Sequence, residues 1–251
     1  MIFYFSATGN SKYVAERIAK ELDTYTENIL ECIEHQKFDF HFTEHESIGI
    51  VAPTYFLGVP KNVKEYLEKV KLRGNGYFFY ISTCGTITGA SGKMADNYLK
   101  QHENKLDAMF SIRMPDTWTP IIDLSNKQKV EKKNKKAELE LMEVIYQIKE
   151  QVKGNHMKYK TPMFAAKAYY STYGIQARTS RFTVEDTCIG CGLCAKKCPA
   201  KAIEMKNGMP IWVKDQCIIC LGCLHRCPEF AIQYGKHTKG HGQYLNPYTN
   251  I

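Results

Sequence analysis

Eight of the ten cysteines lie within residues 188–227, where they form two copies of one spacing. In each copy three cysteines follow one another at intervals of three residues, and a fourth comes four residues later with a proline directly behind it. The second copy begins 29 positions after the first. So many thiols in so short a stretch require either a bound metal or disulfide bonds. The first copy contains Cys188, Cys191, Cys194 and Cys198, and the second contains Cys217, Cys220, Cys223 and Cys227.

The pattern resembles the cysteine run of bacterial ferredoxins, which hold two [4Fe-4S] clusters and exchange the fourth ligand between the two runs. Neither run then completes a cluster alone, so we expect both copies to fold as one cooperative unit. Structural zinc fits less well, because its cysteine pairs are usually separated by a longer loop. Disulfides would need an oxidising compartment, and no signal peptide is recognisable. The resemblance implies one cluster on Cys188, Cys191, Cys194 and Cys227, and another on Cys217, Cys220, Cys223 and Cys198.

The two copies differ in their glycines. Gly190 and Gly192 suit a loop that needs positive φ and free N–H groups close to inorganic sulfide. In the second copy Ile219 and Leu221 take the corresponding positions, and Gly222 follows one place later. We therefore predict a drier shell around the second cluster and a different reduction potential. For His225, in the same run, we expect either donation to cluster sulfur or exposure to solvent.

The start of the chain predicts a strand, a tight loop and a helix. Residues 2–5 are apolar, residues 6–11 have the sequence Ser-Ala-Thr-Gly-Asn-Ser, and Val14, Ile18 and Leu22 then share one helix face. Such a loop directs N–H groups and hydroxyls at the positive end of a helix dipole, where a phosphate is favoured. An ordinary capped connection is the alternative. The loop resembles the phosphate loop of flavodoxins, which implies an FMN phosphate held by Ser6, Ala7, Thr8, Gly9, Asn10 and Ser11.

Further apolar stretches alternate with predicted helices. Residues 28–32, 47–52, 77–82 and 110–114 are expected to be strands, and residues 63–70 carry a helical apolar stripe. This alternation predicts an α/β fold with a doubly wound parallel sheet. The resemblance to flavodoxins implies a five-stranded sheet with the order 2-1-3-4-5.

In such a sheet a ligand lies at the carboxyl ends of the strands, so the loops at residues 53–60 and 83–92 should join the phosphate loop there. The flavodoxin resemblance implies that Tyr55 or Phe56 flanks the flavin ring, and plain packing is the alternative for either side chain. The third loop contains no aromatic residue, so we expect one flavin face to be open. The implied flavin contacts are Pro53, Thr54, Tyr55, Phe56, Thr83, Cys84 and Gly85, the last three through backbone groups.

The remaining chain predicts a long helix capped by Ser125 and a solvated face over residues 127–136. Trp118 is expected to make an interdomain contact, and simple core packing is the alternative. Cys32 is expected to be a small core residue. Four short strands and a turn at residues 207–208 should frame a small α+β ferredoxin region. The predicted organisation is a flavodoxin-like domain at residues 1–154, an interdomain segment at 155–180, a ferredoxin domain at 181–235 and a tail at 236–251.

The formal net charge of +8 does not indicate nucleic-acid binding. Eight thiolates contribute about −8, two oxidised cluster cores about +4 and an FMN phosphate about −2, so the loaded protein would carry about +2.

No apolar run is long enough to span a membrane, and we expect a cytoplasmic protein without membrane or nucleic-acid partners.

The whole chain resembles bacterial and archaeal fusions of a flavodoxin-like domain with a 2[4Fe-4S] ferredoxin domain, and a protein of an anaerobe is expected. The resemblance implies electron transfer between FMN and two [4Fe-4S] clusters, with a low-potential redox protein as donor or acceptor. The alternative is a reductase fed through its clusters that acts with FMN on a small organic substrate. A nicotinamide donor is disfavoured, because no G-x-G-x-x-G sequence follows a strand.

Overall fold

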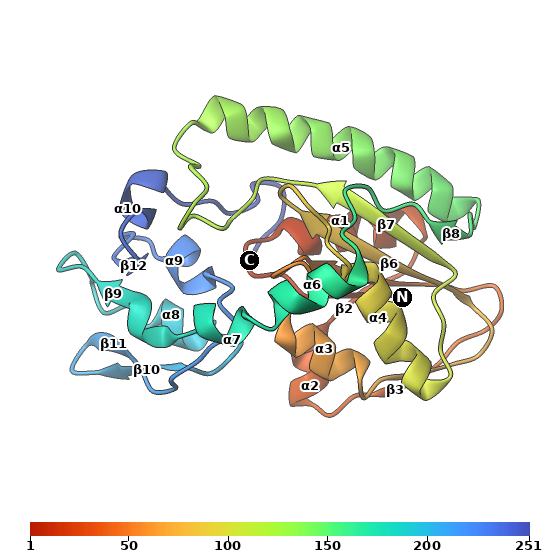
Figure 1. The fold of residues 1–251 in the computed structure, drawn as a ribbon, viewed down its shortest axis with the longest axis horizontal. Coiled ribbons are helices and arrows are strands. Elements are labelled where there is room, and N and C mark those ends of the chain that lie inside the picture. Colours follow the sequence, from red (N-terminus) through yellow and green to blue (C-terminus); the bar gives the residue numbers. More distant parts are fainter. The chain divides into compact units, whose positions relative to one another are not determined.

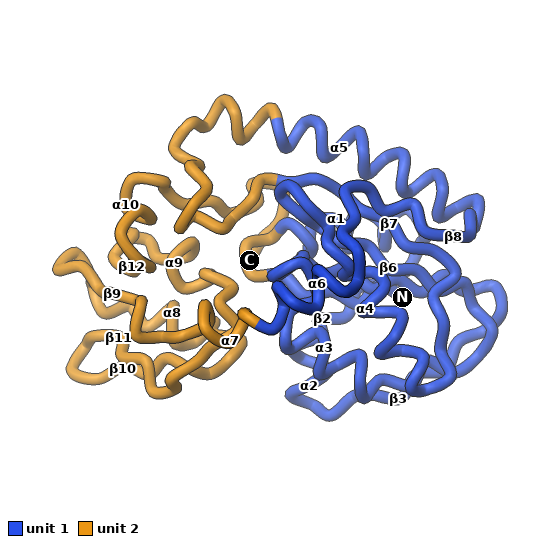
Figure 2. The backbone as a smooth tube through the Cα atoms, in the orientation of Figure 1, with its two compact units in different colours: residues 1–6, 10–114, 133–171 blue, residues 7–9, 115–132, 172–251 orange.

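The computed structural model describes residues 1–251, which divide into two compact units (Figure 2). Unit 1 contains residues 1–6, 10–114 and 133–171, and unit 2 contains residues 7–9, 115–132 and 172–251. Neither unit is continuous in the chain, because three residues of the first loop and the segment before the long helix group with the cysteine runs. The domain boundaries predicted after residues 154, 180 and 235 stay predictions.

Unit 1 is built on a six-stranded sheet in which every neighbouring pair is parallel (Figure 1). Its order is β2-β1-β4-β6-β7-β8. The first five strands in this order have the predicted arrangement 2-1-3-4-5, and β8 adds a two-residue edge. The doubly wound α/β fold is thus confirmed. The strands are β1 (Ile2–Tyr4), β2 (Thr26–Asn28), β4 (Ser47–Pro53), β6 (Tyr77–Cys84), β7 (Ala108–Arg113) and β8 (Gly154–Asn155).

Alternate residues of β6 show how helices cover both faces of the sheet. Phe79 and Ile81 join a buried cluster with the apolar faces of α1 (Asn10–Glu21) and α5 (Lys127–Lys149). Ser82 points to the opposite face, where it meets α4 (Ser91–Leu99). The mostly apolar sequences of β4 and β6 follow from this double burial. The same unit contains α2 (Ile29–Glu34), α3 (Lys61–Leu67), α6 (Met163–Tyr170), the turn η1 (Lys100–His102) and a parallel pair of β3 (Asp39–His41) with β5 (Lys71–Arg73).

Two local predictions are wrong. Residues 28–32 are not a strand, because the side-chain oxygen of Asn28 accepts a hydrogen bond from Leu30 N at 3.0 Å and starts α2. The long helix is capped by Asn126, whose side-chain oxygen accepts from Lys129 N at 3.0 Å, and not by Ser125. The prediction that Cys32 is a small core residue is confirmed, because its side chain is buried.

Unit 2 frames the cysteine runs with two antiparallel pairs of short strands. Asn207 and Gly208, at φ of 52° and 78°, form the predicted hairpin turn. The predicted small α+β region is present. Its elements are β9 (Phe182–Val184) with β12 (Ile232–Tyr234), β10 (Ile203–Lys206) with β11 (Met209–Trp212), the short helices α7 (Tyr173–Gln176), α8 (Leu193–Lys196), α9 (Gly222–Arg226) and α10 (Thr238–His241), and the turn η2 (Thr179–Arg181).

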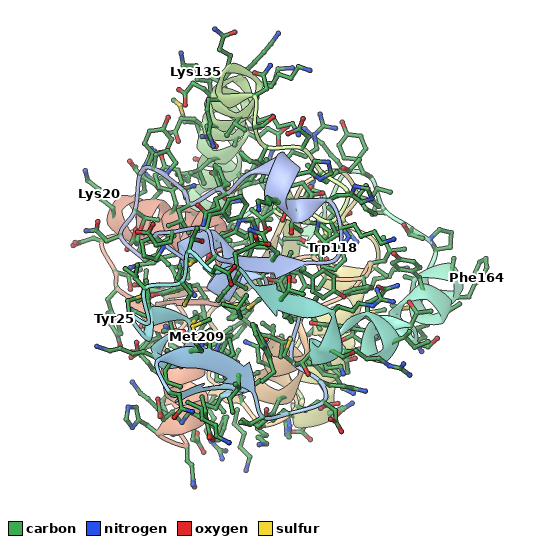
Figure 3. All side chains as sticks on the ribbon, turned by 90° about the vertical axis from the view of Figure 1, so that its left-hand side faces the viewer. Lys20, Tyr25, Trp118, Lys135, Phe164 and Met209 are labelled. Carbon is green, nitrogen blue, oxygen red and sulfur yellow. The ribbon has the colours of Figure 1, made fainter.

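The segment before α5 packs inside unit 2, and the interdomain contact predicted for Trp118 stays a prediction. The ring of Trp118 lies 5.9 Å from that of Tyr234 in β12, and both residues belong to unit 2. The lysines between residues 127 and 136 are all exposed, as expected for a solvated face, and Lys135 points outward in Figure 3. No helix is both long and apolar enough to cross a membrane.

Candidate functional site

The eight cysteines of the two runs line two separate cavities in unit 2. Each cavity takes three cysteines from one run and the fourth from the other, which is the grouping that the ferredoxin resemblance implies. None of the thiols forms a disulfide, and no set of three His, Cys, Asp or Glu side chains is arranged to hold a single metal ion. The first cavity, with an empty volume of about 340 Å³, is lined by Cys188, Cys191, Cys194 and Cys227. The second, of about 310 Å³, is lined by Cys198, Cys217, Cys220 and Cys223.

This donor set fits cubane iron–sulfur clusters, whose protein ligands are thiolates. The backbone adds donors at equivalent places in the two runs. Ala202 N donates to Cys198 Sγ at 3.4 Å, and Ala231 N donates to Cys227 Sγ at 3.3 Å. Such N–H donors to cysteine sulfur stabilise negative charge on a bound cluster.

The loops around the two cavities have the same backbone conformation. Gly190 and Gly192 have φ of 66° and 71°, and their counterparts Ile219 and Leu221 have φ of 47° and 54°. The second run therefore holds two bulky residues in the left-handed region, which L-residues avoid. A Cβ on Gly190 would lie 2.7 Å from the carbonyl oxygen of Gly208, so glycine is sterically required in the first run.

The second cavity is the drier one, as predicted. Ile219 and Leu221 are almost fully buried, whereas Ile189 in the first run is 65% exposed and Cys191 is exposed. Burial raises the pKa of Cys220 to about 12 and the pKa of Cys223 well above its usual range. The two cysteine-lined cavities thus differ in solvent access although the φ angles of their loops match.

His225 does neither of the things expected of it. Its ring is buried, Nε2 donates to the carbonyl oxygen of Thr117 at 2.9 Å, and Nδ1 accepts from Tyr244 N at 3.3 Å. Burial lowers the pKa of His225 to about 4, so the ring is neutral with its proton on Nε2. His225 is a structural link between three segments of unit 2.

In unit 1 the carboxyl ends of β1, β4 and β6 lie next to one another, as the sequence predicted for three convergent loops. Thr54 N donates to the carbonyl oxygen of Thr83 at 2.9 Å, and Pro53 pairs with Thr83 across the two strands. The hydroxyl groups of Ser11 and Thr83 are 2.8 Å apart and join the first loop to the third. The predicted contacts Ser6, Ser11, Pro53, Thr54 and Thr83 therefore lie along this one edge of the sheet.

The first loop fits a phosphate held by neutral donors. Gly9 has a φ of 96°, which lets the chain turn directly into α1 at Asn10. The first turn of α1 contains no acidic residue, so nothing opposes an anion at the positive end of its dipole. Thr8, Asn10 and Ser11 are buried, and Ala7 is buried beside them.

The second loop makes a tight turn with bulky residues at its tip. Tyr55 and Gly58 exchange backbone hydrogen bonds at 2.9 Å, and Phe56 and Leu57 between them have φ of 50° and 64°. This left-handed geometry costs about 1–2 kcal/mol per residue and is the kind of strain found at ligand sites. The Phe56 ring stacks on Tyr169 at 5.9 Å between centroids. Tyr55 and Phe56 are both half-buried, and their place beside a flavin stays a prediction.

The third loop is fixed against the second. Ala90 N donates to the carbonyl oxygen of Leu57 at 2.8 Å, and a Cβ on Gly89 would lie 2.2 Å from that same oxygen. Cys84 is buried and its carbonyl oxygen accepts from Met114 N at 2.9 Å, while Gly85 is half-buried. Backbone contacts thus fix both ends of this aromatic-free loop, at Cys84 and at Ala90.

Sequence reasoning missed two features of this site. The hydroxyl of Ser91 donates to Ser82 at 3.1 Å inside the sheet–helix layer, close to the hydroxyl of Thr54. The C-terminal tail contacts the first loop within unit 2, where Asn246 N donates to the carbonyl oxygen of Thr8 at 2.8 Å. The polar Ser82 within the buried strand β6 is a signal for the first feature, but nothing in the tail indicates the second.

The fold and the cysteine cavities define a flavodoxin-type flavoprotein that also binds iron–sulfur. Two family models match the chain, one described as a flavodoxin domain over residues 1–141 and one as a 4Fe-4S dicluster domain over residues 187–232. The chain therefore belongs to the flavodoxin-domain family and is a fusion with a C-terminal 4Fe-4S ferredoxin domain. Among curated proteins none matches the sequence. Together the two domains indicate an electron-transfer protein that uses FMN and [4Fe-4S] chemistry.

Proposed function

We propose that this protein passes electrons between FMN and two [4Fe-4S] clusters, with a low-potential redox protein as its donor or acceptor. The observation that carries the proposal is the pair of cavities, each lined by four cysteines that come from both runs. Two complete sets of four thiols support two clusters rather than one. The covalent fusion supports exchange inside the chain, because it keeps both kinds of centre at high effective concentration.

Bound clusters would supply one-electron chemistry and bound FMN would supply one- or two-electron chemistry. The protein's own groups have defined tasks in this proposal. The eight cysteines hold the clusters, with Ala202 N and Ala231 N donating to two of the sulfur atoms. The residue 6–11 loop and the start of α1 would bind the FMN phosphate, and the third loop would offer backbone groups to the flavin edge. The cytoplasmic location expected from the sequence stays a prediction.

The alternative is a reductase that passes electrons from FMN to a small organic substrate. A cavity in unit 1 supports this alternative, because its lining includes Gly89 and Ala90 of the third loop. Lys93 and Lys160 also line it, and no carboxylate does. Its substrate would therefore be a small anion.

The test is anaerobic reconstitution with iron, sulfide and FMN, followed by cofactor analysis and stepwise chemical reduction. We expect about eight iron atoms per chain, one FMN, and reduction of clusters and flavin in the same molecule. Reduction of clusters with no accompanying change in the flavin spectrum would contradict the proposal. Fast oxidation of the reduced protein by small anionic acceptors, with no reaction toward ferredoxins or flavodoxins, would favour the alternative.

A further inference from the structure

Residues 243–246 connect the second cysteine run to the first loop by hydrogen bonds. The side-chain amide of Gln243 donates to the carbonyl oxygens of Leu224 and Cys227, each at 2.7 Å. Three residues later, Asn246 N donates to the carbonyl oxygen of Thr8 at 2.8 Å. All these residues belong to unit 2, so the connection lies within one compact body.

The connection is tightly packed at both ends. Tyr244 and Asn246 are buried, and Tyr244 N also donates to the neutral ring of His225 at 3.3 Å. At the other end a Cβ added to Gly9 would lie 2.8 Å from Asn246 Cβ and 2.6 Å from Ile251 Cδ1. The tail therefore cannot move without disturbing residues 8–9, and the run at residues 224–227 cannot move without disturbing the tail.

We propose that residues 243–246 couple retention of FMN to the integrity of the cluster held by Cys188, Cys191, Cys194 and Cys227. This inference rests on the proposed function, which places FMN phosphate in the first loop. Ligation of Cys227 orders the backbone at residues 224–227, because a metal site gains its order only when its ligands are bound. The ordered carbonyl groups hold Gln243, and the tail then holds Thr8 and Gly9 in the conformation that binds phosphate. By reciprocity FMN stabilises this cluster.

The first test compares FMN binding by the cluster-loaded wild type and Gln243→Ala, using flavin fluorescence under anaerobic conditions. We expect FMN to bind about tenfold more weakly to the variant, within the usual range for coupled sites. Iron content and the cluster absorbance spectrum establish that both proteins carry their clusters. Tyr248→Phe is the matched control, because it changes the tail only at an exposed hydroxyl that lies 3.3 Å from Glu131. It should bind FMN like the wild type.

The second test separates the backbone link from the side chain at residue 246. Asn246→Pro removes the N–H that donates to Thr8, whereas Asn246→Ala keeps that N–H and the Cβ. We expect the proline variant to lose FMN faster than the alanine variant. Equal FMN affinity in the wild type, Gln243→Ala and Asn246→Pro, all with clusters loaded, would overturn the coupling.

A third measurement has a readout that does not involve FMN affinity. Iron loss to a chelator is followed with and without saturating FMN. FMN should slow the release of the first cluster's iron in the wild type but not in Gln243→Ala, and an equal effect in both proteins would contradict the proposal. A wild type that binds clusters but no FMN would refute the proposed function itself, whereas a wild type that binds FMN with no difference in the variants would refute only the coupling.

Discussion

The two cysteine runs reach one backbone conformation with different residues. Where the first run uses Gly190 and Gly192, the second uses Ile219 and Leu221 at the same left-handed angles. The backbone angles also agree after the last cysteine of each run. Lys201 and Phe230, again 29 positions apart, have φ of 45° and 49°. The two runs therefore follow the same backbone path with different side chains.

The difference between the runs shows what the bulky residues do. A left-handed Ile or Leu costs about 1–2 kcal/mol in conformational energy, while burial of such a side chain contributes about 1.5–3 kcal/mol. Ile219 and Leu221 are 3% and 2% exposed, so burial offsets the strain. Their counterparts are glycines beside an exposed Cys191. Ile219 and Leu221 thus form an apolar wall beside the second cavity, whereas the first cavity is lined by an exposed cysteine.

The largest expected effect comes from substituting the fourth cysteine of a run, which is predicted to bind the cluster of the other run. Cys227→Ser should remove the first cluster, lined also by Cys188, although Cys227 lies in the second run. Cys198→Ser should remove the second cluster for the same reason. Each variant should hold about half the iron of the wild type, and electron paramagnetic resonance should show which cluster remains. Cys84→Ser, outside both runs, is the control with unchanged iron. Removal of the first cluster by Cys198→Ser would show that the runs do not cross.

A smaller effect separates steric contact from backbone strain in the first run. Gly190→Ala places a Cβ 2.7 Å from Gly208 O at a φ of 66°, whereas Gly208→Ala has a φ of 78° and meets nothing within 4 Å. Both should lose about 1 kcal/mol from the left-handed backbone, and Gly190→Ala should lose about 1–2 kcal/mol more from overpacking. Chemical denaturation of the cluster-loaded protein measures the difference. Equal losses would mean that the loop relaxes away from the contact.

The smallest effect tests the apolar wall. A dry shell disfavours the extra negative charge of a reduced cluster, so the second cluster should have the lower reduction potential. Leu221→Asn, which tolerates the left-handed angle, should raise that potential by on the order of 50 mV, or about 1 kcal/mol per electron. Ile189→Asn, at an already exposed position, should shift neither potential by a comparable amount. Spectroelectrochemical titration measures the reduction potentials of both clusters. An unchanged potential in Leu221→Asn would show that the apolar wall does not cause the difference between them.

The features that can be predicted from the sequence are those set by residues close together in the chain. The cysteine spacing, the Gly9 loop and the apolar strands each follow from ligand geometry, φ preference or double burial within a few residues. The strand predicted at residues 28–32 is wrong, because a short apolar run does not distinguish a strand from a helix, and the cap at Asn28 starts a helix there. The contacts of His225 and of the tail with Thr8 join segments distant in sequence, for which the residues carry no periodic signal.

Rapid mixing gives the most direct test of electron exchange between the clusters and FMN. The anaerobic holo-protein is mixed with a limiting amount of a reductant that reacts with the clusters, and cluster and flavin absorbance are recorded together. We predict that cluster reduction is followed by flavin reduction at a rate independent of protein concentration, as transfer within one chain requires. Flavin reduction whose rate rises in proportion to protein concentration, or clusters that stay reduced beside an oxidised flavin, would contradict this account.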